Sequence, residues 1–175
     1  AMSGCARAVR SARRSTRSGT APPLRRASAT PQDILPPDLP IVALSKGLEL
    51  GTNLVLADVI KETLGKRQPL AVLSGPTFAS EMIDQRPTAM VCASRDRKVS
   101  LRVQQLLASD YLRVNTSDDV VGAELCGALK NVLAIAAGIV EGLELGNNSM
   151  AALVAQGMSE IRWLAERMGA RPATQ

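Results

Sequence analysis

Short apolar runs alternate with helical patterns along the middle of this chain, and this alternation limits the folds available to it. The run from Ile41 to Ser45 is mainly apolar and stops at the polar Lys46, and Leu70–Leu73 is a second run of this kind. Such runs are typical of strands buried on both faces of a parallel sheet, and a helical pattern follows each of them. Two strand-turn-helix units in succession predict an α/β fold.

The same patterns predict the neighbouring elements. Thr52 is expected to cap the first helix, which Gly65 then ends. The remaining elements of this region are expected to be helices over 77–83 and 96–108 and strands over 87–93 and 111–115.

The last third of the sequence has a different character. Residues 117–143 contain no proline, and Asp118 and Asp119 stand where the dipole of a starting helix favours acids, which predicts one long helix. A second helix is expected over 148–168. Val132–Val140 is apolar on all sides, which indicates a buried helix, and it is too short to span a bilayer. We therefore expect the α/β part to give way to an all-helical part with no membrane span.

Positive charge is concentrated at the N-terminal end. Residues 1–32 contain seven arginines and no acid, so the formal net charge of +5 becomes −2 without them. This segment is rich in Ala, Ser and Thr and lacks the apolar stretch of about 7 to 15 residues that a secretory signal needs. We interpret residues 1–31 as an organelle transit peptide, and a disordered or mistranslated leader is the alternative.

Composition excludes several kinds of site. The chain has no histidine, so it can form neither a Ser/His/Asp triad nor a His-ligated zinc site. Cys5, Cys92 and Cys126 form no close-spaced pair, so we expect no disulfide framework, no metal site and a reducing compartment. The three aromatic residues are scattered singly, so we expect no nucleic-acid partner.

Lys130 is the most informative single position. On a helix its neighbours at i−4, i−3 and i+4 are Cys126, Gly127 and Ala134, all small, which leaves room for a partner or a substrate. A lysine in a partly dry cleft near another cation can exchange protons at neutral pH. A solvated surface lysine is the alternative interpretation.

The ends of the first two predicted strands carry further candidates. Lys46 follows the first strand, and open α/β sheets bind ligands at the carboxyl ends of their strands. After the second strand, Gly75 permits close backbone approach and Thr77 supplies a hydroxyl, while the next helix start offers N–H groups to a phosphate or carboxylate. A solvated strand end and a helix cap without a ligand are the alternatives.

Five short motifs stand out when these candidates are taken with their neighbours. They are Ser45-Lys46-Gly47-Leu48-Glu49, Ser74-Gly75-Pro76-Thr77-Phe78-Ala79, Pro87-Thr88-Ala89, Gly127-Ala128-Leu129-Lys130-Asn131, and Gly146-Asn147-Asn148 with Ala151-Ala152-Leu153. In order and separation they resemble the NAD(P)-dependent glycerol-3-phosphate dehydrogenase family, and most closely its plant and algal plastid members. The resemblance runs from about Ile34 to Thr174.

The resemblance implies the second half of a Rossmann-type nucleotide-binding domain over 32–116, followed by the first helices of an all-helical substrate domain over 117–175. The implied activity is reversible hydride transfer between NAD(P)H and dihydroxyacetone phosphate, which gives sn-glycerol 3-phosphate. Site residues are implied as well. Lys130 matches the proton donor and acceptor and also binds the substrate. Lys46 matches a second catalytic residue that contacts substrate and cofactor, and it is expected to lower the pKa of Lys130 and to stabilise developing negative charge. Gly75, Thr77 and Asn131 match substrate-binding positions, and Ala79 matches a cofactor contact.

One family feature is absent from the sequence. No two of the 13 glycines are two positions apart, so the Gly-x-Gly-x-x-Gly turn that seats the cofactor pyrophosphate cannot be present. We therefore expect the middle of a dehydrogenase, with doubtful activity on its own and with the choice between NAD and NADP open. The complete enzyme is expected to be a homo-oligomer in the plastid stroma, with the cytoplasm as the alternative.

Two other functions are considered as alternatives. In the first, the chain is a non-catalytic piece that associates with intact subunits. In the second, it is a related 6-phosphogluconate or β-hydroxyacid dehydrogenase, which also uses a lysine on a long inter-domain helix. The residues of the second and fourth motifs favour glycerol-3-phosphate dehydrogenase over these other dehydrogenases.

Overall fold

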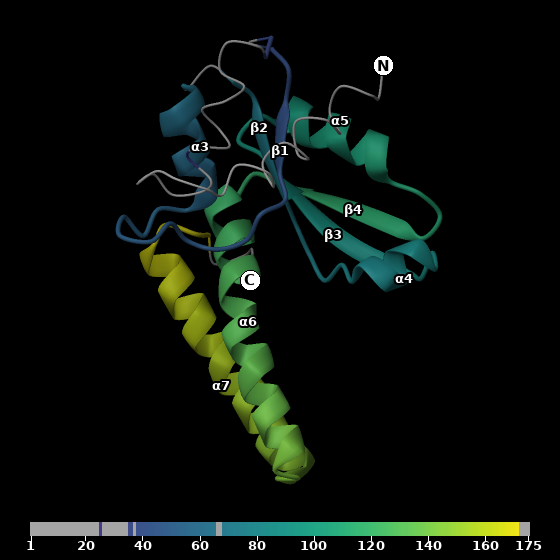
Figure 1. Ribbon diagram of the computed structural model, residues 1–175, viewed down its shortest axis with the longest axis vertical. Coiled ribbons are helices and arrows are strands. Elements are labelled where there is room, and N and C mark those ends of the chain that lie inside the picture. Colours follow the sequence, from purple (N-terminus) through teal and green to yellow (C-terminus); the bar gives the residue numbers. More distant parts are fainter. Residues whose placement is uncertain (1–24, 26–34, 37, 66–67, 172–175) are drawn as a thin grey trace, which may run out of the picture.

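The computed structural model describes residues 25, 35–36, 38–65 and 68–171 (Figure 1). Of the leader predicted over 1–31, all residues except Arg25 lie outside this description. The elements are, in chain order, β1 (Ile41–Ala43), α3 (Leu56–Leu64), β2 (Leu70–Ser74), α4 (Ala79–Ile83), β3 (Thr88–Ala93), α5 (Arg97–Leu107), β4 (Leu112–Ser117), α6 (Val120–Gly142) and α7 (Gly146–Arg167).

The four strands form one mixed sheet in the order β1-β2-β3-β4. β1 pairs with β2, and β3 with β4, in parallel, whereas β2 and β3 run antiparallel. The sequence predicted parallel strands, and the short α4 explains the difference. Five helical residues span about 8 Å and cannot carry the chain back along a five-residue strand of about 17 Å. The chain therefore turns and returns beside β2 in the opposite direction.

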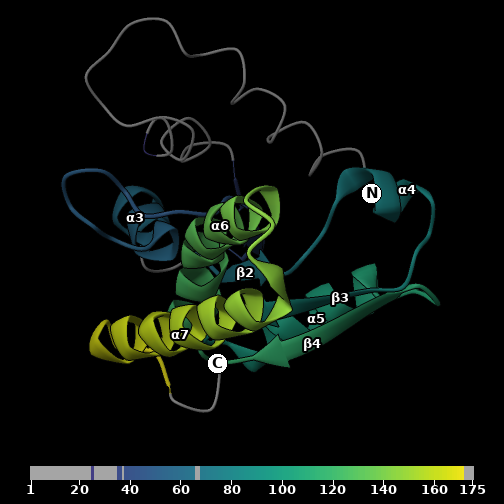
Figure 2. The ribbon, with the colours of Figure 1, turned by 90° about the horizontal axis from the view of Figure 1, so that it is seen from below.

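Both faces of the sheet are covered, as the apolar run in β2 predicted (Figure 2). Leu70 and Val72 pack against residues of α3 and α6. Ala71 and Leu73, which point the other way, pack against residues of α5. A strand buried on both faces carries apolar side chains without alternation, which is the pattern seen in the sequence.

The backbone N–H groups at the start of α6 are capped by a neighbouring residue, whereas those at the start of α3 are capped by a residue far away in the sequence. α6 begins beside Asp118 and Asp119 as predicted, and Asp119 also caps it, because its Oδ1 accepts a backbone N–H of the first turn at 2.9 Å. The prediction that Thr52 caps α3 is wrong, because the helix begins only at Leu56, with Val55 at its N-cap. The Thr52 hydroxyl donates instead to the carboxylate of Glu49 at 2.6 Å. The acceptor at the start of α3 is instead Glu124 of α6, which binds the N–H of Ala57 at 3.0 Å.

α6 and α7 lie side by side as a long hairpin that points away from the sheet (Figure 1). At the base of the hairpin, Leu125 and Ala165 are completely buried. The chain after α7 is tied to the start of α6, because the backbone N–H of Arg171 donates to Asp119 at 2.8 Å. The Arg171 guanidinium also pairs with the carboxylate of Asp118 at 2.7 Å.

The outer half of the hairpin leaves apolar side chains on the surface. Val132, Ile135 and Ile139 are 69%, 68% and 56% exposed. The prediction that Val132–Val140 forms a buried helix is therefore wrong for the described part of the chain, where no residue of this stretch is buried and α7 lies beside α6. Further exposed apolar side chains on the hairpin are Leu143, Leu145, Val154, Met158 and Trp163.

By length and composition, α6 could cross a membrane, since its best window has a mean hydropathy of 1.6. One such helix is a weak indication, because core helices of soluble proteins have the same composition. α6 also carries Glu124 and Lys130, and its first half packs on the sheet. That no segment spans a membrane stays a prediction.

Candidate active site

Lys46 lies in the loop after β1, at the carboxyl end of that strand. Its Nζ donates a hydrogen bond to the carbonyl oxygen of Gly75, which follows β2, at 2.8 Å. Because β1 and β2 are parallel, their carboxyl ends meet at the same edge of the sheet. The structure thus brings two of the predicted site residues together.

A buried carboxylate holds the loop that carries Lys46. Glu49 is 6% exposed, and it accepts hydrogen bonds from the Thr52 hydroxyl at 2.6 Å and from the Arg25 guanidinium at 2.6 and 2.7 Å. These donors, Arg25 first, hold the pKa of Glu49 below its usual range. The carboxylate is therefore charged at neutral pH and keeps its donors in place.

Gly75 lies against the backbone of β3. A Cβ atom at this position would stand 2.9 Å from the carbonyl oxygen of Ala89 and 3.0 Å from the Cα of Met90. The close backbone approach that the sequence predicted for a ligand is thus made to a neighbouring strand. Thr77 lies two residues further along the loop, and Ala79 is the first residue of α4.

α6 packs across the same strand ends through a glycine. A Cβ atom on Gly127 would lie 2.6 Å from the hydroxyl oxygen of Ser74 and 3.8 Å from the side-chain carbons of Lys46. The small residues beside Lys130 were predicted to leave room for a partner. On the Gly127 side, Ser74 and the stem of Lys46 fill that room.

Lys130 follows Gly127 by three residues and is exposed. Partial burial lowers the pKa of Lys46, and the positive charge of Lys130 lowers it further, so the two ammonium groups lie close enough to interact. Two neighbouring cations at a strand end can bind an anion or stabilise an oxygen that gains negative charge. The arrangement suits acid/base chemistry on a small anionic substrate.

Three predicted site residues stand apart from this pair of lysines. Among the described residues, no hydrogen bond or ion pair joins Thr77, Ala79 or Asn131 to Lys46 or Lys130. Asn131 is exposed on α6 directly after Lys130. The binding roles of these three residues stay predictions.

Sequence reasoning missed Glu124. This side chain is 5% exposed, and its two oxygens lie 3.0 and 3.3 Å from the backbone nitrogen of Ala57. Burial raises its pKa to about 7. A signal was present in the sequence, because Glu124 is the one charged residue in α6 before Lys130. A single acid in an apolar segment points to a buried polar contact.

The described residues do not form a complete seat for a dinucleotide. In Rossmann-type domains the pyrophosphate lies over a glycine-rich turn at a free helix N-terminus. In the loop before α3, Gly47 and Gly51 are four positions apart, and the carboxylate of Glu124 occupies the N-terminus of the helix. Lys46 and Ala79, the predicted cofactor contacts, can supply only one side of a cofactor site.

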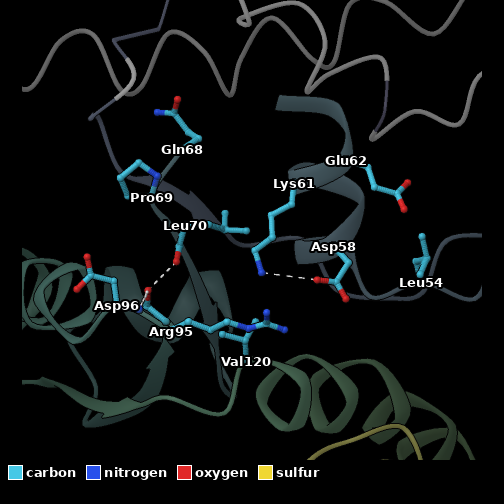
Figure 3. Close-up of a pocket in the computed structure, with 11 residues that line it drawn as sticks. Leu54, Asp58, Lys61, Glu62, Gln68, Pro69, Leu70, Arg95, Asp96 and Val120 are labelled. Atoms are coloured by element: carbon cyan, nitrogen blue, oxygen red, sulfur yellow. Dashed lines mark hydrogen bonds and ion pairs between the residues drawn. The ribbon is translucent and has the colours of Figure 1, made fainter. Parts of the chain in front are cut away.

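A separate pocket of about 700 Å³ opens at the opposite end of the sheet, where β2 begins (Figure 3). Lys61 pairs with Asp58 on its wall at 3.6 Å, and the Ser94 hydroxyl donates to the carbonyl oxygen of Leu70 at 2.7 Å. None of the predicted site residues lines this pocket. Because acidic and basic side chains both line it, no single ligand chemistry is indicated.

Solved structures define the class of protein. The chain is similar to glycerol-3-phosphate dehydrogenase from Coxiella burnetii, with a TM-score of 0.80 and 36% identity over 86% of this chain and 46% of that one. It is also similar to DsGPDH of Dunaliella salina, with a TM-score of 0.79 and 28% identity over 86% and 26% of the two chains. The predicted class is confirmed: the second half of a Rossmann-type nucleotide-binding domain followed by the first helices of an all-α domain.

Two family models narrow this class. Residues 20–100 match the NAD-dependent glycerol-3-phosphate dehydrogenase N-terminus, and residues 119–175 match the C-terminus of the same family. The chain belongs to the NAD-dependent glycerol-3-phosphate dehydrogenase family, as the motifs predicted.

Curated relatives show how much of the family's length is represented. The chain is 62% identical to "Glycerol-3-phosphate dehydrogenase [NAD(+)] 2, chloroplastic" of Arabidopsis thaliana over 143 residues, which are 81% of this chain and 34% of that protein. It is 47% identical to "Glycerol-3-phosphate dehydrogenase [NAD(P)+]" of Myxococcus xanthus over 86% of this chain and 45% of that protein. The chain thus spans between a third and a half of the length of these relatives.

Proposed function

We propose that this chain forms the central part of an NAD(P)-dependent glycerol-3-phosphate dehydrogenase. The reaction is reversible hydride transfer between NAD(P)H and dihydroxyacetone phosphate, which gives sn-glycerol 3-phosphate. One observation carries the proposal: Lys46, bound to Gly75 at a strand end, lies within electrostatic reach of Lys130 on the helix that crosses that end. Family membership supports the same reaction.

The two lysines have different roles at the substrate oxygen. A bound NAD(P)H would supply the hydride that the carbonyl carbon receives. Lys130 Nζ gives its proton to the carbonyl oxygen, and in the oxidative direction its neutral amine takes that proton back. An ammonium has three N–H donors, and Lys46 uses one of them on Gly75, so two remain for the substrate. Both positive charges stabilise the negative charge that develops on the oxygen.

The neighbouring loops complete the proposed site. Gly75 and Thr77 follow β2 at the edge where Lys46 lies, and we assign them to the phosphate side of the substrate. Asn131, beside Lys130 on α6, orients the substrate. Ala79, at the start of α4, contacts the cofactor.

A second candidate function rests on the surface of the hairpin. Val132, Ile135 and Ile139 are more than half exposed along one helix. Exposed apolar surface of this extent is typical of an interaction site. This favours a non-catalytic role in which the chain associates with intact subunits of the same family.

The plastid is the proposed location. Two plant relatives, from Arabidopsis thaliana and Oryza sativa, are named as chloroplastic and are 62% and 64% identical to the chain. The arginine-rich composition of residues 1–19, which precede the family match from residue 20, agrees with import into an organelle. Arg25 of the predicted leader hydrogen-bonds to Glu49 beside the candidate site. The cytoplasm is the alternative, and assembly of the complete enzyme as a homo-oligomer stays a prediction.

A graft tests the catalytic proposal. The matched 143 residues of the Arabidopsis relative are replaced by the corresponding residues of this chain, and oxidation of NADH by dihydroxyacetone phosphate is measured. We expect turnover in the graft and a loss of about 10² to 10⁴-fold in kcat for Lys130→Met, with cofactor affinity unchanged. Lys130→Arg should not restore turnover, because a guanidinium does not give up its proton.

Lys98→Met is the matched control, because Lys98 is exposed on α5 and forms no part of the proposed site. Its turnover should equal that of the graft. Turnover within a few-fold of the graft in Lys130→Met would contradict the catalytic role. An inactive graft, together with a chain that binds the intact relative in sedimentation, would favour the second candidate.

A further inference from the structure

We propose that Glu124 is a positioning residue whose carboxylate fixes α6 against the first turn of α3 and thereby keeps Lys130 beside Lys46. The inference deepens the proposed function, on which its catalytic meaning rests. Whether Glu124 holds α6 in place does not depend on turnover, so this part is tested without an activity measurement.

The contact is buried and joins distant parts of the chain. Glu124 lies 67 residues after Ala57, and its carboxylate oxygens are 3.0 and 3.3 Å from the Ala57 nitrogen. The N–H groups in the first turn of a helix have no partner within that helix. Because Ala57 is completely buried, water cannot replace the carboxylate as the acceptor. Loss of the contact therefore leaves a buried donor unsatisfied.

Helix geometry connects this contact with the lysine. Glu124, Gly127 and Lys130 are spaced by three residues, so they lie within an arc of about 120° on α6. Gly127 allows α6 to come close to Ser74, but it offers no side chain that could stop the helix from sliding along its axis. The Glu124 hydrogen bond adds a directional contact to the apolar packing of Val120 and Ala123 against the sheet. A shift of α6 by one residue along its helical screw would move Lys130 by about 1.5 Å and turn it by about 100°.

The same contact also fixes the element next to Lys46. The loop from β1 to α3 carries Lys46, and α3, with Ala57 in its first turn, is the far end of that loop. Glu124 thus links the helix that carries one lysine to the segment that carries the other. Displacements of about 1 Å at a reacting group can cost about 10²-fold in rate, so this link bears on catalysis without touching the substrate.

Two substitutions separate a hydrogen-bonding role from a charge effect. Asp58 of α3 repels the charge of Glu124 and Lys61 attracts it, so the charge interacts with groups other than the Ala57 N–H. Glu124→Gln keeps an acceptor oxygen at the same reach and removes the charge. Glu124→Asp keeps the charge but shortens the side chain by one methylene, which takes the oxygens out of hydrogen-bonding distance of the Ala57 nitrogen.

The test is a titration of the lysines of the full chain, monitored by NMR of ¹³C-labelled lysine side chains. Burial and the charge of Lys130 both lower the pKa of Lys46, so the part of the lowering that Lys130→Met abolishes reports the proximity of Lys130. We expect the pKa of Lys46 to stay below its usual range in the parent chain and in Glu124→Gln. It should rise in Glu124→Asp and Glu124→Ala. Lys130→Met, the positive control, should raise it too, and Glu124→Ala should add nothing further in that background.

Unfolding by urea is measured in parallel, so that only folded samples are compared. A lower stability for Glu124→Ala with an unchanged pKa of Lys46 would show a helix cap and no more, and it would overturn the proposal. If Glu124→Ala does not fold, the Gln and Asp variants decide. The proposal requires that the pKa of Lys46 is unchanged in Glu124→Gln and raised in Glu124→Asp, and any other result overturns it. An inactive graft with the expected titration would refute the proposed function and leave the positioning role intact.

Discussion

The two halves of α6 are both rich in apolar residues but have different surroundings. In the first half Leu125 is completely buried and Glu124 is 5% exposed, because the sheet, α3 and the base of α7 surround this part. In the second half Val132 and Ile135 are more than two-thirds exposed, with α7 alone packing beside them. Lys130 stands at the boundary between these halves.

The proposed acid/base residue thus lies where the packed part of α6 ends. At the boundary, Lys130 is held from one side by the packing of Gly127 and faces open space on the other. A site at the end of a buried segment thus combines fixed geometry with access for a substrate.

Removing the same amount of side chain from each half of α6 should give very different losses of stability. Leu125→Ala leaves a cavity in a fully buried cluster and should lower the free energy of unfolding by about 2 to 5 kcal/mol. Ile135→Ala, at a position 68% exposed, should change it by about 0.5 kcal/mol or less. Urea denaturation followed by circular dichroism measures both. Equal losses would show that the outer half is covered in solution.

Glu124, in the buried half of α6, should make the free energy of unfolding depend on pH. Burial raises its folded-state pKa to about 7, well above the ordinary value for glutamate, so the folded state binds this proton more tightly than the unfolded state. The stability that this proton contributes is present below about pH 4.5 and is lost as pH rises through 7, by up to about 3 kcal/mol. Because the chain has no histidine, few other groups titrate between pH 5 and 8.

Glu124→Gln should remove this dependence, since the amide accepts the same hydrogen bond without ionising. The measurement is the free energy of unfolding of both chains at pH 5 and pH 8, and the difference between the chains should grow with pH in favour of Gln. A difference that is the same at both pH values would mean that Glu124 is already ionised at pH 5.

Local patterns in the sequence predicted the elements well. β2 is apolar at successive positions and is buried on both faces, and the acid at the start of α6, Asp119, caps that helix. Such features depend on residues that are neighbours in the sequence. The same holds for Gly65, whose positive φ of 84° ends α3 as predicted.

Long-range features could not be predicted in this way. Thr52 stands where a cap is expected, but α3 begins only at Leu56, and the acceptor at its first turn comes from Glu124, 67 residues after Ala57. The apolar run Val132–Val140 does not reveal which element covers it. The position of Lys46 at a strand end made it the candidate second cation near Lys130, but the sequence alone left the role of each lysine open, and the family resemblance supplied those roles.

The smallest expected effects come from a pair of glycines in α6, one in each half. At Gly127 an added Cβ would lie 2.6 Å from the Ser74 hydroxyl oxygen, whereas at Gly138 it would meet nothing within 4 Å. Gly127→Ala should therefore destabilise by about 1 to 3 kcal/mol through overpacking. Gly138→Ala should stabilise by about 0.5 to 1 kcal/mol, because alanine loses less backbone entropy in a helix.

Turnover of the graft should also respond differently to a substitution in the inner half of α6 and to one in the outer half. Gly127→Ala pushes α6 away from Ser74 and Lys46 and moves Lys130 with it, so kcat should fall, while Gly138→Ala, eight residues beyond Lys130, should leave kcat unchanged. Urea denaturation and NADH oxidation on both variants give the result. If Gly127→Ala were as stable and as active as Gly138→Ala, α6 would not be held at the strand ends by close packing, and the fixed geometry assigned to the inner half would be lost.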